Sequence, residues 1–378
     1  MHELDASYKL NFTDFSRIDA FHNAVVLTMG SSYVVQSVAI PLVPSLSRTV
    51  RHKHYSDVSP AYLTSQEPYL VHIYLAVAYV LKHDMALSNK TELDPEDRTA
   101  LAYHLFHGTA LHSQKVAMIA RFDKLSNDEL NAVWLSASIL CTAYYGYLES
   151  HDPHHVWPLR AGPMGTEQDC VRINLAKQGL WDVVKPLREG SPYQALGTDP
   201  ATISLPPQGS PITKAVLPSS FLALFELDEK SPCETCPYYD VVCELSHLIP
   251  QVCDSFTFMR FLFFWHQMPK TFTKLLETKD PRALLIQAYF YAKVSVYHGT
   301  WISRRAIVVG RSISIYLRTF CGDNKAIQEL VTFPIAVLET LETSIAAAAE
   351  RSTYILEETR EPSSSITSCL RSDTLVRA

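Results

Sequence analysis

The sequence has no excess of basic residues. Its 33 lysines and arginines are outnumbered by 39 aspartates and glutamates, so the 378 residues carry a net charge of −6. Free-standing nucleic-acid-binding domains are usually basic, and we therefore expect no direct nucleic-acid binding by this chain. The sequence also lacks an uninterrupted apolar run of about 18 residues, the length that crosses a bilayer. For this reason we expect no membrane span.

Cysteine is sparse and the common catalytic motifs are missing. Eight cysteines are too few for a disulfide scaffold in a chain of this length, and the first ten residues show no secretory signal, so we expect reduced thiols inside the cell. There is no phosphate-binding glycine-rich loop, no G-x-S-x-G motif and no H-E-x-x-H motif. We expect neither enzyme activity nor a cofactor, and a helical enzyme assembled from distant residues is the least favoured alternative.

What is present is a strong helical periodicity, clearest at residues 279–317. Asp280 followed by Pro281 is a typical helix start, because Asp accepts hydrogen bonds from free amides and Pro fits the first turn. Gly299 is expected to end this helix, and a second helix should follow to Leu317. Apolar residues of the first helix recur on one predicted face: Leu285, Ala288, Tyr289, Ala292 and Val296. The second helix contains three arginines among its apolar residues, which indicates that one of its sides faces solvent: Arg304, Arg305 and Arg311.

Similar patterns predict further helices that begin at Pro68, at Pro95 after Asp94, and at Ser126. Glu129 completes a capping box with Ser126. The helix that follows is apolar nearly all round, so it should lie buried at the centre of the fold. No segment shows a competing strand-type alternation. The predicted fold class is therefore all-α, a multi-helix bundle.

Residues 151–218 form a proline-rich and glycine-rich segment, which we expect to be a long irregular region because regular helix does not persist through such a composition. One short helix is predicted within it, from Cys170 to Val184. The last helical stretch of the chain should be broken at Pro334. The predicted organisation is one helical domain at 1–360, with halves 15–150 and 219–360 joined by 151–218, and a disordered tail at 361–378.

Four cysteines form the first candidate metal-binding pattern. Cys233, Cys236 and Cys243 have the spacing C-x2-C-x6-C, and Cys253 follows. A binuclear zinc cluster needs a second C-x2-C pair, which this segment lacks. Thiols buried in or beside a helix are therefore the expected arrangement, and no metal is predicted here.

Histidines form the second candidate pattern. His104 and His107 lie three residues apart on one predicted helix, so they can share a face. A further group is HDPHH at residues 151–155. The spacing does not fix the remaining ligands that a metal would need, so the sequence predicts no metal site. His112 falls on the apolar stripe of its helix and is expected to be a hydrogen-bonded core histidine.

Four segments stand in an order and spacing that indicate a family. They are EPYLVHIYLAVAYVL at 67–81, AYHLFHGTALHSQK at 102–115, DPRALLIQAYFYA at 280–292 followed by Trp301, and the pair Phe333-Pro334. Together they resemble the C-terminal regulatory domain of fungal binuclear-zinc-cluster (Zn(II)2Cys6) transcription factors, in the group of the sterol-uptake-control regulators. The sequence departs from that family in that the N-terminal cysteine cluster, its basic linker and the dimerising coil are not found.

The resemblance implies a regulatory domain of a transcription factor that controls lipid or specialised-metabolite genes in the nucleus, with shuttling to the cytoplasm left open. It implies a small apolar ligand, a sterol or other lipid, and protein partners of the transcription machinery. The candidate ligand-binding residues are aromatic: Phe264, Trp265, Tyr289, Tyr297 and Trp301. The alternative function is that of a DNA-binding-deficient helical interaction partner of a full-length factor.

Overall fold

The computed structural model describes residues 67–119, 125–162, 164–191, 193–194, 217–227, 236–253, 261, 264, 268–296 and 301–341. No strand occurs among these residues, and helices make up most of them, so the predicted all-α class is confirmed. The helices are α5 (Pro68–Ser88), α6 (Pro95–Ile119), α7 (Asn127–Gly146), the short 3-10 helix η2 (Pro153–His155), α8 (Thr166–Gly179), α9 (Trp181–Val184), α11 (Ser219–Leu224), α12 (Tyr239–Leu248), α14 (Lys270–Glu277), α15 (Pro281–Ser295), α16 (Trp301–Phe320) and α17 (Lys325–Leu330). The predicted helix end at Gly299, the predicted tail at 361–378 and the first 66 residues lie outside the described ranges.

The helix starts predicted from short local patterns are confirmed. Ser126 caps α7 and forms a capping box with Glu129. Asp280 caps α15, where its carboxylate accepts hydrogen bonds from the backbone amides of Arg282 and Ala283. Caps of this kind satisfy amides that have no partner inside the helix, and each typically stabilises a helix by about 1 kcal/mol. The local sequence therefore determines where these two helices begin.

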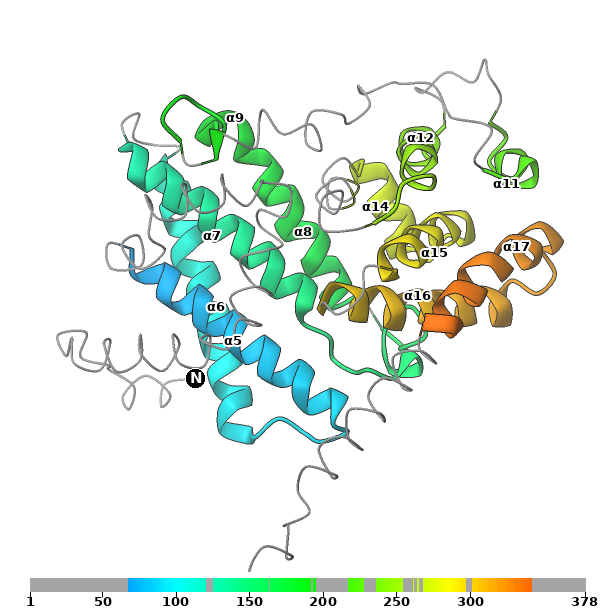
Figure 1. Ribbon diagram of the computed structural model, residues 1–378, viewed down its shortest axis with the longest axis horizontal. Coiled ribbons are helices and arrows are strands. Elements are labelled where there is room, and N and C mark those ends of the chain that lie inside the picture. The colour runs from blue at the N-terminus through cyan, green and yellow to red at the C-terminus, as the bar shows by residue number, and fades with distance from the viewer. Residues whose placement is uncertain are drawn as a thin grey trace, which may run out of the picture.

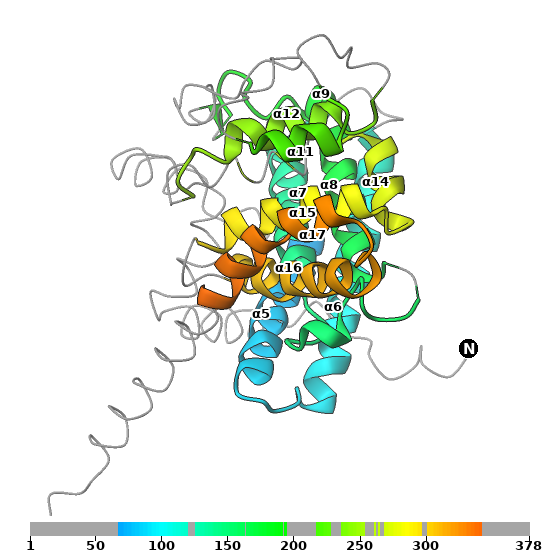
Figure 2. The same ribbon diagram turned by 90° about the vertical axis from the view of Figure 1, so that its right-hand side faces the viewer.

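The helices form two groups that meet where α16 contacts α7 and η2 (Figure 1). In the first helical group, which comprises α5 to α9, α5 pairs with α6, and α7 packs against α5, α6 and α8. In the second helical group, which comprises α11, α12 and α14 to α17, α15 lies between α12 and α16 in both views (Figures 1 and 2). Helix α15 is thus the central element of the second group.

The central position predicted for the helix after Ser126 agrees with the burial of α7. One side of α7 packs against α5 in a cluster that includes Ala132, Ile139 and Leu140. Another side packs against α9 through Val133 and Trp134. Because apolar residues on several faces of α7 are removed from water, this helix holds the first group together.

Helix α15 is buried more completely than its sequence pattern predicts. The predicted apolar face is buried except at Val296, which is 39 % exposed. Residues on the other faces are buried as well, including Leu284, Ile286 and Gln287. The prediction of an amphipathic helix is therefore wrong for α15, because neighbouring helices cover the sides that the periodicity left to solvent.

Two boundaries differ from the prediction in the second half of the chain. The helix expected from Cys170 begins at Thr166, after Gly165, whose φ of 59° reverses the chain direction. The break expected at Pro334 falls at Val331 instead, and Pro334 lies within the first turn of the helical residues 332–341. A proline in the first turn loses no helical hydrogen bond, which explains why the helix passes through it.

Helix α5 is the one helix among the described residues that is long and apolar enough, by length and composition alone, to cross a membrane. Leu70, Ile73 and Val77 of this helix are buried in a cluster with residues of α7. One side of helix α5 is therefore packed against α7.

Candidate functional site

Two of the five aromatic residues predicted to line a ligand pocket have described side chains, Phe264 and Tyr289. Both are buried. The ring of Phe264 stacks on the ring of Phe290, with centroids 4.2 Å apart and planes at 11°. The Tyr289 hydroxyl donates a hydrogen bond to the carbonyl of Leu330 at 3.0 Å. Since Tyr289 and Phe290 are consecutive on α15, Phe264 and Tyr289 lie against different faces of this helix.

The other three predicted pocket residues are placed only in part. Trp265 and Tyr297 lie outside the described residues, and Trp301 is described as the first residue of α16 without its side chain. The described members of the set therefore mark two places on α15. The Phe264–Phe290 stack is one of them, and the contacts of Tyr289 with Phe221 and Phe333 are the other.

Gln287 is the most unusual residue of α15. Its side chain is 1 % exposed, and among the described residues neither its amide nitrogen nor its amide oxygen has a hydrogen-bond partner. Leaving a buried polar group without a partner costs about 1–3 kcal/mol, so most such groups in proteins are paired. Gln287 lies three residues before Phe290, which puts it on the same face of α15 as the Phe264–Phe290 stack.

Glu244 is a second buried polar residue without a complete set of partners. It lies on α12, one of the helices that contact α15, and its Oε1 atom has no hydrogen-bond partner in the part of the chain that the structure describes. Burial raises the pKa of the Glu244 carboxyl above its ordinary value, because an apolar environment disfavours the charged form. Two helices that contact each other, α12 and α15, thus each carry a buried polar side chain with an unpaired atom.

A buried ion pair between Arg305 and Glu167 fixes the geometry around α15. Arg305 is 0 % exposed, so the prediction that it lies on a solvated side of α16 is wrong. Its guanidinium also donates to the carbonyls of Tyr144, Tyr145 and Tyr147, where α7 ends. These carbonyls have no partner within the helix, and a cation near a helix C-terminus is favourable.

Tyr291 joins α15 to the same ion pair. Its hydroxyl donates to Oε2 of Glu167 at 3.1 Å, while Arg305 pairs with Oε1. Burial raises the pKa of Tyr291 well above its ordinary value, so this hydroxyl stays protonated. Residues from α8, α15 and α16 are therefore held in one polar network inside the core, and this network fixes the position of α15.

Three histidines meet between α5 and α6. The Nδ1 atoms of His72 and His104 are 3.0 Å apart, and the ring of His107 lies 5.6 Å from that of His72. Burial and the two neighbouring imidazoles lower the pKa of His104 to about 4, so it is neutral at physiological pH. One of the two Nδ1 atoms must carry the proton that the other accepts. The pair is thus a neutral hydrogen bond across the helix interface.

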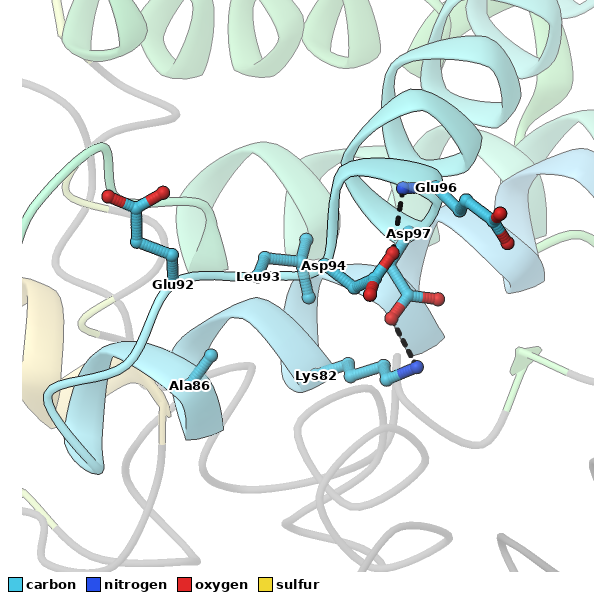
Figure 3. Close-up of a pocket in the computed structure, with 7 residues that line it drawn as sticks. All are labelled: Lys82, Ala86, Glu92, Leu93, Asp94, Glu96 and Asp97. Atoms are coloured by element: carbon cyan, nitrogen blue, oxygen red, sulfur yellow. Dashed lines mark hydrogen bonds and ion pairs between the residues drawn. The ribbon is translucent and has the colours of Figure 1, made fainter.

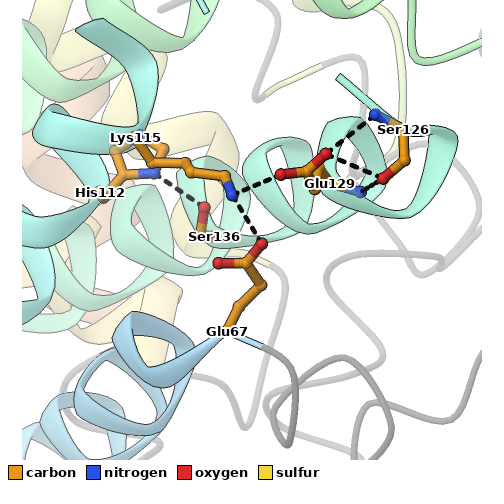
Figure 4. Close-up of polar contacts among 6 residues, drawn as sticks. All are labelled: Glu67, His112, Lys115, Ser126, Glu129 and Ser136. Atoms are coloured by element: carbon orange, nitrogen blue, oxygen red, sulfur yellow. Dashed lines mark hydrogen bonds and ion pairs between the residues drawn. The ribbon is translucent and has the colours of Figure 1, made fainter. Parts of the chain in front are cut away.

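His112 is the core histidine that its place on the apolar stripe predicts. It is buried, and its Nδ1 lies 2.8 Å from the hydroxyl of Ser136 (Figure 4). The Ser136 hydroxyl donates to the carbonyl of Val133, so His112 is the donor in the contact between the two side chains. This hydrogen bond connects α6 with α7.

Figure 4 also shows Lys115 between two carboxylates. The Lys115 ammonium group lies 2.9 Å from Glu67 and 2.8 Å from Glu129. Glu129 belongs at the same time to the capping box of α7 with Ser126. The contact with Lys115 lowers the pKa of Glu129 to about 2. These ion pairs connect the starts of α5 and α7 to α6. The charge of Lys115 is balanced by the two carboxylates, so this group of residues gives no indication of a ligand site.

An open pocket of about 480 Å³ lies at the turn between α5 and α6 (Figure 3). Four of its seven lining residues are acidic, and Asp97 forms an ion pair with Lys82. Asp94 accepts a hydrogen bond from the backbone amide of Glu96 at the start of α6. The side chain of Glu92 points away from the other carboxylates in Figure 3. The carboxylates therefore do not converge on a common point that a cation would occupy.

The candidate metal patterns are only partly described. Cys233 lies outside the described residues, whereas Cys236 is half-buried and the thiols of Cys243 and Cys253 are buried. His151 contacts Asp84 at 2.9 Å. Within the part of the chain that the structure describes, no three His, Cys, Asp or Glu side chains are arranged to hold a metal ion.

Comparison with protein-family profiles, with curated proteins and with solved structures finds no match to this chain. The sequence prediction missed Gln287 and the pairing of Arg305 with Glu167. A signal was present for Gln287, which stands inside the apolar run LLIQAYF, whereas Arg305 follows Arg304 and gives no such signal. A single polar residue within such a run indicates either a buried partner or a binding role.

Proposed function

We propose that this chain is the effector-responsive regulatory domain of a fungal transcription factor that controls lipid or specialised-metabolite genes in the nucleus. The effector is a small apolar molecule, a sterol or another lipid, which binds in the second helical group next to α15. The domain passes its state to protein partners of the transcription machinery.

The observation that carries the proposal is the unpaired carboxamide of Gln287 in an apolar core. A side chain of this kind is costly for folding alone, whereas a ligand site needs a few polar groups among apolar walls. The surrounding core supplies such walls, for example the stacked rings of Phe264 and Phe290. An effector that forms hydrogen bonds with this amide would remove the free-energy penalty of the unpaired group, and so would stabilise the bound state.

The family resemblance supports the same function through the positions of its segments. Residues 67–81 and 102–115 fall on α5 and α6, which pack against each other, and residues 280–292 form most of α15. The network of Arg305, Glu167 and Tyr291 connects α15 to the first helical group. A ligand beside α15 can therefore bias the arrangement of both groups, provided that it binds two arrangements with different affinity.

A reporter assay tests this function. The complete chain is fused to a heterologous DNA-binding domain, and reporter activity is measured in yeast with and without an azole inhibitor that lowers the sterol content. We expect reporter activity to change by about fivefold or more, the range of ordinary allosteric coupling. An unfused DNA-binding domain is the control. Reporter activity that is equal in both conditions would contradict effector control and favour the interaction-partner alternative.

A further inference from the structure

We infer that Gln287 binds the polar head of the effector and that this head is a hydroxyl group. The inference rests on the proposed function and assigns one residue and one functional group within it.

The other buried polar side chains of α15 show how unusual Gln287 is. Tyr289 donates to the carbonyl of Leu330, Tyr291 donates to Glu167, and Ser295 donates to the carbonyl of Ala292. Each of these groups has a partner within hydrogen-bonding distance. Gln287 is nearly unexposed and has no partner among the described residues for either amide atom. It is thus an exception among the buried polar side chains of this helix and needs its own explanation.

Folding does not explain a glutamine at this position. A methionine has a similar length and no group that requires a hydrogen bond, so it would fill the same space without the cost of two unpaired polar atoms. Residues that reduce stability in this way are typical of binding sites, where function is gained at the expense of the unliganded fold.

The surroundings of Gln287 define the kind of molecule that would bind there. One turn along the same face of α15, Phe290 stacks on Phe264. One turn in the other direction lie Ala283 and Leu284, which are fully buried. A molecule that reaches Gln287 therefore contacts apolar and aromatic side chains over most of its surface. Its body must be apolar, and its polar part must be small.

The unpaired atoms of Gln287 select the polar part. The amide offers one acceptor oxygen and an NH2 donor group, and a hydroxyl both donates and accepts. A hydroxyl can thus donate to the amide oxygen, whereas an ester or ether oxygen can only accept from the NH2 group and leaves the amide oxygen unpaired. Burial raises the pKa of the Glu244 carboxyl on the neighbouring α12 above its ordinary value, because an apolar environment disfavours a negative charge. A neutral alcohol fits these groups better than a carboxylate.

Binding of two matched probes tests the inference. The purified complete chain is titrated with dehydroergosterol, a fluorescent sterol with one hydroxyl, and with its acetate ester, which has the same apolar body without the hydroxyl. We expect the wild-type chain to bind the alcohol at least about tenfold more tightly than the ester, because sites built to pair a hydroxyl reject analogues that lack it. Gln287→Met should weaken binding of the alcohol about tenfold and leave binding of the ester within about twofold.

Gln328→Met is the matched control. Gln328 is a glutamine with partners, since its amide donates to the carbonyls of Leu317 and Cys321 at 2.9 and 3.0 Å. Its replacement should lower the Tm and leave both probe affinities unchanged. Replacement of Gln287 should show the opposite pattern, with an equal or higher Tm and a loss of the preference for the alcohol. This crossed result separates a binding role from a role in stability.

Two results would overturn the inference, and they differ in what they say about the proposed function. If the wild-type chain binds dehydroergosterol and Gln287→Met binds it equally well, the amide does not hold the head group, although the effector-responsive function stands. A water molecule that pairs with Gln287 would give this result. If the wild-type chain binds neither probe, the inference and the sterol effector on which it rests both fail.

Discussion

Arg305 and Glu167, which are 138 residues apart in the sequence, form an ion pair without access to solvent. The same arginine satisfies carbonyls at the end of α7, and the glutamate lies in the first turn of α8. Cations near helix C-termini and anions near helix N-termini are both favourable. This pair therefore holds α7, α8 and α16 in one arrangement, and Tyr291 connects α15 to it.

Removing one partner of this pair should destabilise the fold strongly. Arg305→Met leaves Glu167 buried without a cation, and we expect the free energy of unfolding to fall by about 3–5 kcal/mol. The double variant Arg305→Met with Glu167→Met should lose less than the single variant, because no unpaired charge remains. Urea unfolding followed by circular dichroism measures both.

The control for this experiment is an exposed ion pair. Arg98 pairs with Glu92 on the surface, with both side chains more than half exposed. Arg98→Met should change the free energy of unfolding by less than about 1 kcal/mol. An effect of Arg305→Met as small as that of Arg98→Met would show that the buried pair does not hold the helices together.

The buried His112 should make stability depend on pH. Burial lowers the pKa of His112 to about 4 from 6.5, so between these values the unfolded chain binds a proton that the folded chain does not. The contribution of His112 to the free energy of unfolding is then fully present above pH 6.5. It decreases by up to about 3 kcal/mol as the pH is lowered toward 4. His104 acts in the same direction.

His112→Gln should make this pH dependence shallower between pH 6.5 and 4. The exposed His155 provides a matched control, and His155→Gln should leave the slope as in the wild-type chain. Thermal unfolding measured at steps across this range gives the slopes. Equal slopes for the wild-type chain and His112→Gln would contradict the assigned role.

Gly310 allows the close approach of α16 to α15. A Cβ atom at Gly310 would lie 2.9 Å from Leu338 and 3.1 Å from Cβ of Tyr291, and both neighbours are buried. Gly310→Ala should therefore destabilise the chain by about 1–3 kcal/mol through overpacking, despite the better helix propensity of alanine. At Gly179, at the end of α8, no described atom beyond the helix's own backbone and the adjacent residues lies within 4 Å of such a Cβ. Gly179→Ala should therefore raise the melting temperature, because alanine favours helix and meets no close neighbour there. A similar rise in Gly310→Ala would refute this packing account.

Local sequence patterns predict the helices of this chain better than the partners of its polar residues. The helix start at Asp280, the capping box of Ser126 with Glu129 and the core position of His112 all follow from residues within one or two turns. These features depend on short-range geometry, which the sequence contains directly.

The polar contacts that fix the core come from residues far apart in the chain. Nothing near Arg305 indicates that its partner is Glu167, and its position beside Arg304 favours a solvated surface. The burial of α15 on several sides, Gln287 included, likewise depends on separate helices such as α12 and α16 that contact it. Periodicity describes one helix at a time, so it does not show which sides several neighbours will cover.

The central claim, that the second helical group binds an apolar effector with a hydroxyl head, is tested most directly by identifying what the protein carries. The complete chain is expressed in a fungal host, purified, extracted with organic solvent and examined by mass spectrometry, with Gln287→Met prepared in parallel. We expect the wild-type chain to yield about one hydroxyl-bearing lipid per chain, as a one-site ligand in excess would give, and Gln287→Met to yield much less. Wild-type protein that is folded but carries no lipid, or a lipid content equal in both proteins, would contradict the account.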